Sequence, residues 1–511
     1  MNNKPNRRDF IKLAGLIPAS AMAPHALQRL SSRTSLQDGE QNVLILVFDA
    51  WSAYHVSTYG YQRETTPNLA RLVDQAVVYH NHYAGGNFTT PGTASLLTGT
   101  LPWTHRAFQP NGTVIEPYVT RNIFSVFKNH YRIAYTHNPW ANTLLEQFSG
   151  GMDELVPWLS LFLESYDEII HTLFKDDDDI ASVSWTRNTS INEEGFAYSL
   201  FLSHLYETLR EQNIASIRKD YPRGIPAIGR AETNFILDQA VNWIGDRLTK
   251  IPQPFMGYFH FLPPHGPYRT SLEFINVFGN DGYKPITKPE DVFTQKFSQA
   301  ELNNKRTEYD EFILYADNEF GMMFEQLKTS GLLENTWVVL TSDHGEMFER
   351  GIDGHSVDAM YEPVIRIPLM IFEPGRTTRE DIHTPTSAID ILPTMLHVTG
   401  QEIPAWAEGK VIAPYADSSA DVNRGVYTVR SNKTEQLAPL ERVSITLTRG
   451  KYKIHYYAGY EERNVFEMVK LYDVEADPEE LVDLVDIERD VAGTLLNELK
   501  TKLDEVNRPY L

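Results

Sequence analysis

The sequence predicts an α/β fold built on a mostly parallel central sheet, and two apolar runs are the first reason. Residues Asn42–Asp49 and Trp337–Glu346 each begin with an unbroken series of apolar residues and end in acidic residues. Runs of this length are typical of strands that are buried on both faces, as in parallel sheets. The second reason is the alternation of strand and helix patterns from Phe255–Phe261 to Pro368–Phe372, which is the order of a sheet covered by helices.

The elements before this region follow in order. Residues 40–148 contain the first strand, a short helix and another short strand at Tyr131–Tyr135. Residues 150–235 are expected to form a helical insertion, because Trp158–Phe174 and Phe196–Tyr206 both show helical spacing of apolar residues.

The C-terminal part predicts a small α+β subdomain with an antiparallel sheet. A stretch rich in Pro, Gly and Ser at 400–423 is typical of a linker. Val443–Thr448 and Tyr452–Tyr457 alternate around Arg449-Gly450, which indicates a hairpin. An amphipathic helix is expected at about 488–506. The predicted division of the chain is 1–35, 36–415 and 416–511.

Length and composition limit the class of protein. With 511 residues, the chain can bury a large core and divide into more than one unit. The formal net charge of −22 argues against nucleic acid as a partner, because nucleic acid binding needs clustered Lys and Arg.

The N-terminus resembles a twin-arginine export signal. Arg7-Arg8 precede a short apolar stretch, Leu13–Ala23, which ends in the small residues Ala21-Met22-Ala23. A frayed basic N-terminus is the alternative. No later segment offers about 20 uncharged apolar residues. We therefore expect a periplasmic or extracellular protein without a stable membrane anchor.

Polar residues at the ends of the two apolar runs predict a metal site. Asp49 follows the first run, and Asp343 and His344 follow the second. Ligand sites in parallel sheets form beyond the carboxyl ends of the strands. Two carboxylates and an imidazole suit a divalent cation better than a bare buried pair of acids, which would repel each other. Taken alone, Asp49 could instead cap the following turn.

A hydroxyl nucleophile is predicted at the start of the segment Thr89–Gly99. Pro91 suits the first turn of a helix, Thr89 or Thr90 can cap it, and Gly99 can end it. A hydroxyl there meets unpaired N–H groups, which favour an anionic ester. A neighbouring metal would lower the pKa of the hydroxyl. The alternative is that Thr89 only caps the helix and that water is the nucleophile.

Several segments resemble the sulfatases of the alkaline phosphatase superfamily. In that family the nucleophile motif is Cys-x-Pro-Ser-Arg, followed by a helix that ends in Leu-Leu-Thr-Gly; Thr89–Gly99 matches it. The other matches occur in family order: Leu101–His105, Pro264–Tyr268, Thr341–Glu346, His355, Tyr361–Pro368, Ile389–Thr394 and Leu471–Pro478. They extend over most of residues 40–485.

The resemblance implies an alkaline-phosphatase-like fold and a set of site residues. One divalent ion would be held by Asp49, Asp343, His344 and Thr89. Thr89 would attack the ester and form a covalent intermediate. His265 and His355 would stabilise the charged oxygens and protonate the leaving group.

The departures from the family pattern limit the reactions that the site is expected to catalyse. Thr89 replaces the Cys or Ser that is oxidised to formylglycine, and the chain has no Cys. Thr93 replaces the Arg of the motif, Ala50 the second Asp of a pair, and Val357 a Lys. The remaining residues are similar to the threonine-nucleophile branch, which includes phosphoglycerol and phosphoethanolamine transferases.

We therefore expect an exported, metal-dependent hydrolase of sulfuric or phosphoric esters, acting on a small molecule or a glycan. The alternatives are a transferase that acts on envelope components and a non-catalytic, metal-stabilised binding protein. Loss of a carboxylate at Ala50 and the imidazole of His344 favour Mn²⁺, the family precedent favours Ca²⁺, and Zn²⁺ is a further alternative.

Three features stay open from the sequence. His260 and His137 could be site residues or hydrogen-bonded core histidines. The acidic run Lys175–Asp179 could bind Ca²⁺ or form a solvated loop.

Overall fold

An eight-stranded sheet forms the centre of the protein in the computed structural model, which describes residues 41–163, 212–228, 233–416 and 423–511. The strand order is β11-β2-β10-β7-β1-β6-β4-β5. Only β10 runs against its neighbours, so the predicted mostly parallel sheet is confirmed. The strands are β1 Asn42–Phe48, β2 Val77–Tyr79, β4 Tyr131–Thr136, β5 Glu154–Leu155, β6 Phe255–Phe261, β7 Thr336–Thr341, β10 Leu369–Phe372 and β11 Glu380–Ile382.

The register of the three central strands brings their carboxyl ends to one edge. β1 lies between β6 and β7 and is parallel to both. Val47 pairs with His260 on one side and with Thr341 on the other. All three strands are buried throughout, as their continuous apolar sequences predict.

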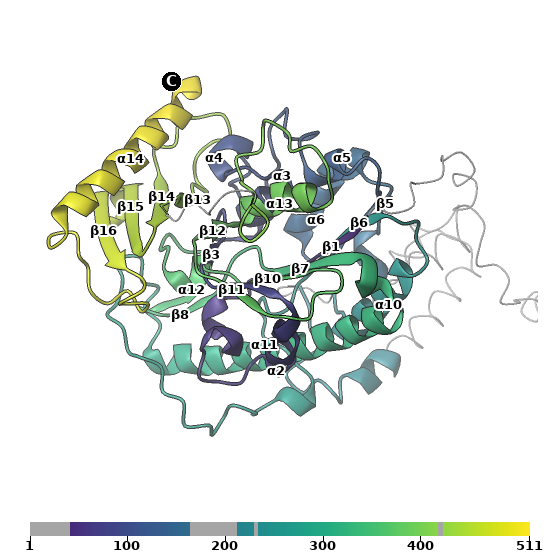
Figure 1. Ribbon diagram of the computed structural model, residues 1–511. Helices are drawn as coiled ribbons and strands as arrows, with labels where there is room; N and C mark the ends of the chain where they lie inside the picture. The colour runs from purple at the N-terminus through teal and green to yellow at the C-terminus, as the bar shows by residue number, and fades with distance from the viewer. Residues whose placement is uncertain (1–40, 164–211, 229–232, 417–422) are drawn as a thin grey trace, which may run out of the picture. The chain divides into compact units, whose positions relative to one another are not determined.

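Helices cover both faces of this sheet (Figure 1). On one face lie α2 (Pro67–Leu72), α10 (Leu237–Leu248) and α11 (Gln299–Thr329), and they share an apolar core with the sheet. On the other face lie α3 (Thr89–Thr98), α6 (Pro139–Phe148) and α13 (Ile391–Val398), which form a second core. Shorter elements are β3 His82–Tyr83, α4 Pro102–His105, α5 Ile123–Val126, β8 Met347–Glu349, β9 Ile352–Gly354, α12 Glu362–Ile365 and β12 Thr386–Ser387.

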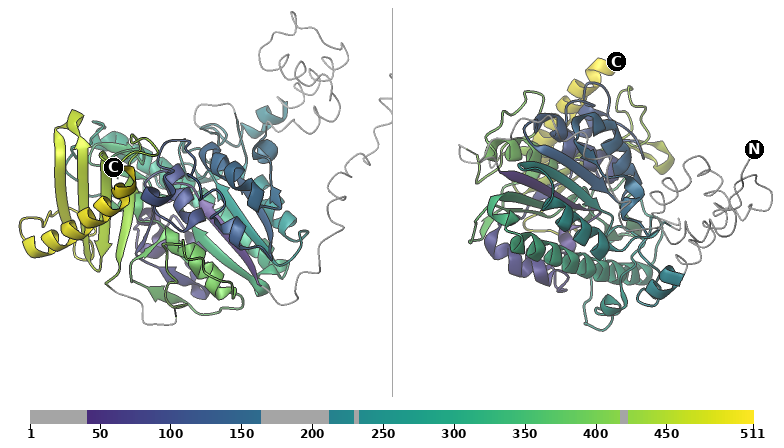
Figure 2. Two further views of the ribbon diagram at one scale, coloured as in Figure 1. Left: turned by 90° about the horizontal axis from the view of Figure 1, so that it is seen from above. Right: turned by 90° about the vertical axis from the view of Figure 1, so that its right-hand side faces the viewer.

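A second, antiparallel sheet occupies the C-terminal part, as expected. It consists of β13 (Gly425–Arg430), β14 (Val443–Arg449), β15 (Tyr452–Tyr460) and β16 (Val465–Asp473) in that order. β14 and β15 form the predicted hairpin. Helix α14 (Arg489–Asn507) lies beside this sheet (Figure 2) and buries Leu495, Leu499 and Leu503.

The predicted insertion and linker differ in part from the structure. Trp158–Leu161 form one turn of 3-10 helix, and Phe162 is already extended, so no α-helix begins at Trp158. Residues 212–217 are helical. The segment 400–416 has no helix or strand, yet it is held against the core, since the Tyr79 hydroxyl donates to the carbonyl of Ala413 at 2.7 Å.

Some predictions lie outside the described residues: the export signal, the helix Phe196–Tyr206 and the acidic run Lys175–Asp179. Residues 41–511 form one compact unit, so the boundary between 36–415 and 416–511 stays a prediction. In the described parts of the chain, no helix combines the length and the apolar character needed to cross a membrane.

Candidate active site

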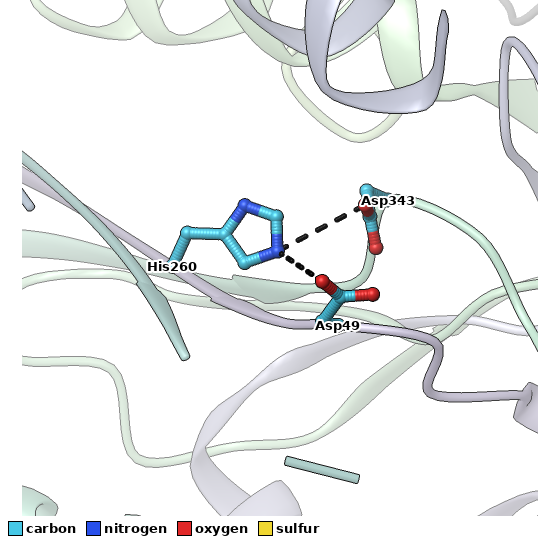
Figure 3. Close-up of side chains that lie close together, drawn as sticks. All are labelled: Asp49, His260 and Asp343. Atoms are coloured by element: carbon cyan, nitrogen blue, oxygen red, sulfur yellow. Dashed lines mark ion pairs between the residues drawn. The ribbon is translucent and has the colours of Figure 1, made fainter. Parts of the chain in front are cut away.

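Two buried carboxylates and a buried imidazole meet at the carboxyl edge of the central sheet. Asp49 follows β1 directly, Asp343 follows β7 by two residues, and His260 lies near the end of β6. His260 Nε2 is 3.3 Å from Asp49 Oδ2 and 3.8 Å from Asp343 Oδ2 (Figure 3). One potential ligand atom from each of the three lies within 4.8 Å of the others, a spacing that a single metal ion can bridge.

His344 adds a second imidazole to this group. Its Nε2 is 3.3 Å from Asp49 Oδ1 and 3.6 Å from Asp343 Oδ2. The other ring nitrogen, Nδ1, donates to the carbonyl of Gly345 at 2.9 Å. Such a bond fixes the orientation of the ring and directs Nε2 toward the carboxylates, as in histidines that bind metals. We call Asp49, His260, Asp343 and His344 the ligand cluster.

Electrostatics in the ligand cluster favour a cation. Burial raises the pKa of Asp49, but the imidazoles of His265, His260 and His344 outweigh it and hold that pKa well below its usual range. Burial and the charge of Asp49 raise the pKa of Asp343. Burial alone would lower the pKa of His344, but the charges of Asp343 and Asp49 outweigh burial and raise this pKa to about 9. Ionised Asp49 thus repels a second negative charge on Asp343. A divalent ion would relieve this repulsion.

The donor atoms present fit a divalent metal. Asp49 Oδ1 and His260 Nε2 are buried and have no hydrogen-bond partner in the described residues. Buried polar atoms without partners are costly and call for an ion or water. Two carboxylates and two imidazoles form a mixed oxygen and nitrogen set, which suits Mn²⁺ or Zn²⁺ better than Ca²⁺.

Thr89 lies at the start of α3, beside the ligand cluster. Its Oγ1 is 3.5 Å from His344 Nε2. The N-cap is Phe88, which makes no side-chain capping bond, so the prediction that Thr89 or Thr90 caps the helix is wrong. The Thr90 hydroxyl is buried and has no hydrogen-bond partner in the part of the chain that the structure describes. One turn after Thr89, the Thr93 hydroxyl donates to Asp343 Oδ2 at 3.4 Å.

Two glycines allow α3 to take this position. A Cβ on Gly92 would lie 2.2 Å from the carbonyl oxygen of Asp343, so only glycine permits this close approach. Gly99 ends the helix in the left-handed conformation, with φ of 65°, as the sequence predicts.

Asn138 contacts both Thr89 and the ligand cluster. It is the N-cap of α6, and its Oδ1 accepts from the backbone N–H groups of Trp140 and Ala141 at 2.8 and 3.4 Å. Its Nδ2 donates to Asp49 Oδ2 and, at 3.2 Å, to Thr89 Oγ1.

Two further histidines lie beside the cluster. The ring of His355 is 4.2 Å from that of His344, and His265 is 4.9 Å from His355. His355 is buried and its Nδ1 is 2.9 Å from Glu346 Oε1, whereas His265 is half-buried. Burial lowers the pKa of His355 to about 4, so its neutral ring donates from Nδ1 and leaves Nε2 bare. Burial favours the neutral acid in Glu346, yet His355 keeps the pKa of this carboxyl below its usual value.

The structure brings together all the residues that the sequence singled out for the site. These are Asp49, Thr89, His265, Asp343, His344 and His355; their chemical roles stay predictions. His260 joins them, whereas His137 does not: its ring stacks on Phe235 at 4.3 Å and both ring nitrogens lack partners among the described residues.

Sequence reasoning missed Asn138 and Glu346. The Asn-Pro pair at 138–139 signals a helix start, and Glu346 belongs to the motif with Asp343 and His344. Neither signal indicates which way the side chain turns, so only the fold shows their contacts.

The structure also shows the positions at which the sequence departs from the family pattern. Ala50 has a φ of 60° and its methyl group offers no ligand. The largest charge effects on Asp49, Asp343 and His344 come from aspartates and histidines, and none comes from Lys or Arg.

Comparisons with known proteins agree with this geometry. A model of the sulfatase family matches residues 41–401, and a model of the C-terminal part of N-sulphoglucosamine sulphohydrolase matches residues 355–509. The fold is shared with phosphonate monoester hydrolase of Agrobacterium radiobacter, with a TM-score of 0.62 and 17% identity; the match covers 92% of this chain and 96% of that one.

Named sulfatases are also similar to this chain. Choline-sulfatase of Rhizobium meliloti is 24% identical over 88% of this chain and 83% of its own length. Arylsulfatase K of Canis lupus familiaris is 24% identical over 48% of this chain and 51% of its own. The chain thus spans about half the length of the arylsulfatase K proteins that it matches. With the family model matching most of the chain, the protein belongs to the sulfatase family.

Proposed function

We propose that the protein is a metal-dependent hydrolase of sulfate or phosphate esters and that Thr89 is its nucleophile. The observation that carries this proposal is the position of Thr89 Oγ1, 3.5 Å from His344 Nε2 and 3.2 Å from Asn138 Nδ2. The hydroxyl does not cap α3, so the alternative reading of Thr89 as a helix cap loses its support. The named relatives, among them an ulvan-active sulfatase of Formosa agariphila, support sulfate esters as the first class to test.

The ligand cluster would hold one divalent ion through Asp49, Asp343, His344 and His260. When bound, such an ion acidifies a hydroxyl and polarises the ester oxygens.

The remaining steps follow from the positions of the side chains. Thr89 Oγ forms a bond to the sulfur or phosphorus while the bond to the leaving oxygen breaks. The Thr89 proton passes to solvent, and the leaving oxygen takes a proton from His265, which is half-buried and so reaches solvent. Water then attacks the same centre and its proton goes to the bare Nε2 of His355. The bond to Thr89 breaks, and the departing Thr89 oxygen takes back a proton from solvent, to which His355 releases its own.

The charges of the site favour singly charged substrates. Asp49, Asp343 and Glu346 contribute negative charge, and among the described residues no Lys or Arg ranks with the largest influences on them. A sulfate monoester and a phosphate diester each carry one negative charge, whereas a phosphate monoester carries two near neutral pH. We therefore propose sulfate monoesters, phosphate diesters and phosphonate monoesters over phosphate monoesters.

The test is a panel of 4-nitrophenyl esters: sulfate, phosphate, a phosphate diester and a phosphonate monoester, each with Mn²⁺, Zn²⁺ or Ca²⁺. The wild-type protein is expected to hydrolyse at least one singly charged ester. Thr89→Val keeps the branched shape, removes the hydroxyl and is expected to abolish turnover. Thr89→Ser is expected to keep part of it, and mass spectrometry of a quenched reaction should find the transferred group on residue 89.

Thr90→Val is the matched control, because the Thr90 hydroxyl has no hydrogen-bond partner among the described residues. It should keep wild-type turnover. Equal activity in Thr89→Val would assign the attack to water, and a metal-loaded wild-type protein that turns over no ester would favour the binding-protein alternative.

We also propose export by the twin-arginine route, on the strength of Arg7 and Arg8. Arg7→Lys with Arg8→Lys is expected to leave the protein in the cytoplasm, as cell fractionation would show. Normal export of this double variant would refute the proposal.

A further inference from the structure

Asn138 caps a helix and at the same time contacts both Thr89 and the ligand cluster. Its Oδ1 is engaged by two backbone N–H groups at the start of α6. Its Nδ2 points the opposite way, to Asp49 and Thr89. The side chain is buried, with 5% of its surface exposed.

These contacts fix which end of the amide faces the site. A flipped amide would place its NH₂ against the N–H groups of Trp140 and Ala141, at the positive end of the helix dipole. The flip would also turn the carbonyl oxygen toward the carboxylate of Asp49. Both contacts would be repulsive, so the amide presents N–H donors to the site. Asn138 therefore cannot serve as an oxygen ligand for a metal without leaving its cap.

Group transfer at this site requires a hydrogen-bond donor of this kind. As an ester group moves to Thr89, negative charge on its outer oxygens must be stabilised by donors that are already in place. Among the described residues, no Lys or Arg appears among the largest charge effects on the cluster. Asn138 Nδ2 lies 3.2 Å from the attacking oxygen atom, and its cap holds it there.

We propose that Asn138 is a catalytic residue, which donates from Nδ2 to an outer oxygen of the sulfuryl or phosphoryl group during transfer to Thr89. This inference rests on the proposed function. Without substrate, one N–H of Nδ2 donates to the Thr89 hydroxyl and the other to Asp49, and the N–H that faces Thr89 is the one that would turn to the ester oxygen. A neutral donor in this position adds no fixed positive charge, in keeping with a preference for singly charged esters.

The test uses Asn138→Ser in the full-length, metal-loaded protein. Ser caps helices about as well as Asn, but its short side chain does not reach Thr89. We expect kcat to fall about 10²-fold or more, with unchanged metal content and Tm. The inhibition constant of orthovanadate, whose bound form imitates the five-coordinate transition state, should rise by a similar factor, while KM changes much less. Asn138→Asp also keeps the cap but cannot donate, and should lose kcat equally.

Asn122→Ser is the matched control, since Asn122 caps α5 in the same way and lies outside the site. It should leave kcat unchanged. Unchanged kcat and orthovanadate inhibition in Asn138→Ser, or a loss fully explained by lower Tm or metal content, would overturn the inference alone. A wild-type protein without any turnover would overturn the proposed function, and this inference with it.

Discussion

Neighbouring side chains decide what each residue of this site can do. Asp49 and Asp343 are the same residue type at the same edge of the sheet, yet their pKa values move in opposite directions. Asp49 faces three imidazoles, whereas Asp343 faces the charge of Asp49 itself. In the proposed function the pair would bind a cation as one unit, and the choice of cation would depend on which nitrogen donors accompany it.

The first prediction concerns His260. In His260→Asn the shorter amide cannot reach Asp49 and Asp343, so the cluster loses one nitrogen donor. We expect affinity for Zn²⁺ and Mn²⁺, measured by titration calorimetry, to fall at least about tenfold, with a smaller change for Ca²⁺. Asp343→Asn should lose all three ions, because it removes charge. His137→Phe is the control, and wild-type Zn²⁺ affinity in His260→Asn would exclude His260 as a ligand.

The second prediction concerns Glu346 and the tautomer of His355. In Glu346→Gln the amide can donate to Nδ1 of His355, which moves the ring proton to Nε2 and removes the base for water. By analogy with other carboxylate–histidine pairs, kcat should fall about 10²-fold or more. The covalent intermediate on Thr89 should then accumulate, giving a burst in rapid-mixing kinetics. Asp353→Asn, two residues before His355, should show wild-type kinetics; a slow Glu346→Gln variant without a burst would contradict the assignment.

At the scale of elements, helix α3 and the loop after β7 form one rigid contact. Gly92 lies against the backbone of Asp343, and Thr93 donates to its side chain. The helix therefore sets the distance between the nucleophile and the ligand cluster. A change in this contact should alter metal binding and turnover together.

The third prediction tests this contact with Gly92→Ala. In an ordinary helix interior, Gly→Ala stabilises a protein by about 0.5–1 kcal/mol. Here the new Cβ would lie 2.2 Å from a backbone oxygen, so we expect a lower Tm and a loss of turnover. Gly493→Ala in α14 is the matched control, because nothing lies within 4 Å of its Cβ position, and it should raise Tm. A stabilised, fully active Gly92→Ala variant would show that the helix can move away.

At the scale of the whole molecule, a buried ionic group connects the C-terminal sheet to the edge of the active site. Lys453 of β15 has no exposed surface, and its Nζ is 2.7 Å from both Glu362 and Glu480. Glu362 begins α12, and two residues later the carbonyl of Val364 accepts from Gly345 N–H at 2.7 Å. The C-terminal sheet thus supports the loop that carries Asp343 and His344.

The fourth prediction is that Lys453→Met destabilises the protein by about 3–5 kcal/mol, because two buried carboxylates lose their counter-charge. Urea unfolding at pH 7 would measure this. Lys451→Met, in the turn just before this strand and at the surface, should change little.

The buried ionic group around Lys453 also predicts how the stability of the protein depends on pH. Burial lowers the pKa of His455 to about 4 from its ordinary 6.5, so its contribution is lost as pH falls through that interval. Burial favours neutral Glu480, but Lys453 and His455 hold its pKa below the ordinary 4.5, so further stability is lost below that pH. In Lys453→Met the unpaired Glu480 should take up a proton more readily. The difference in unfolding free energy from wild type should therefore shrink on acidification, and a constant difference would refute this account.

The sequence predicts the central sheet and the ends of its strands well, because buried parallel strands have continuous apolar sequences. Asp49, Asp343 and His344 follow from strand ends alone. The role of His260 could not be decided from the sequence, because a histidine within a buried strand gives the same sequence pattern whether its side chain faces the core or a ligand. Asn138 and Glu346 could not be predicted, because their roles depend on which partner holds the other end of each side chain.

The parallel register of β1, β6 and β7 has a consequence for how such a chain can vary. Successive residues of a strand face opposite sides of the sheet, so one residue inserted into any of these strands would turn its site residue away from the other two. Insertions in the connecting segments would leave that edge unchanged. Length variation compatible with this centre is therefore confined to the connections, and a deletion scan across Asn42–Phe48 should find no tolerated position.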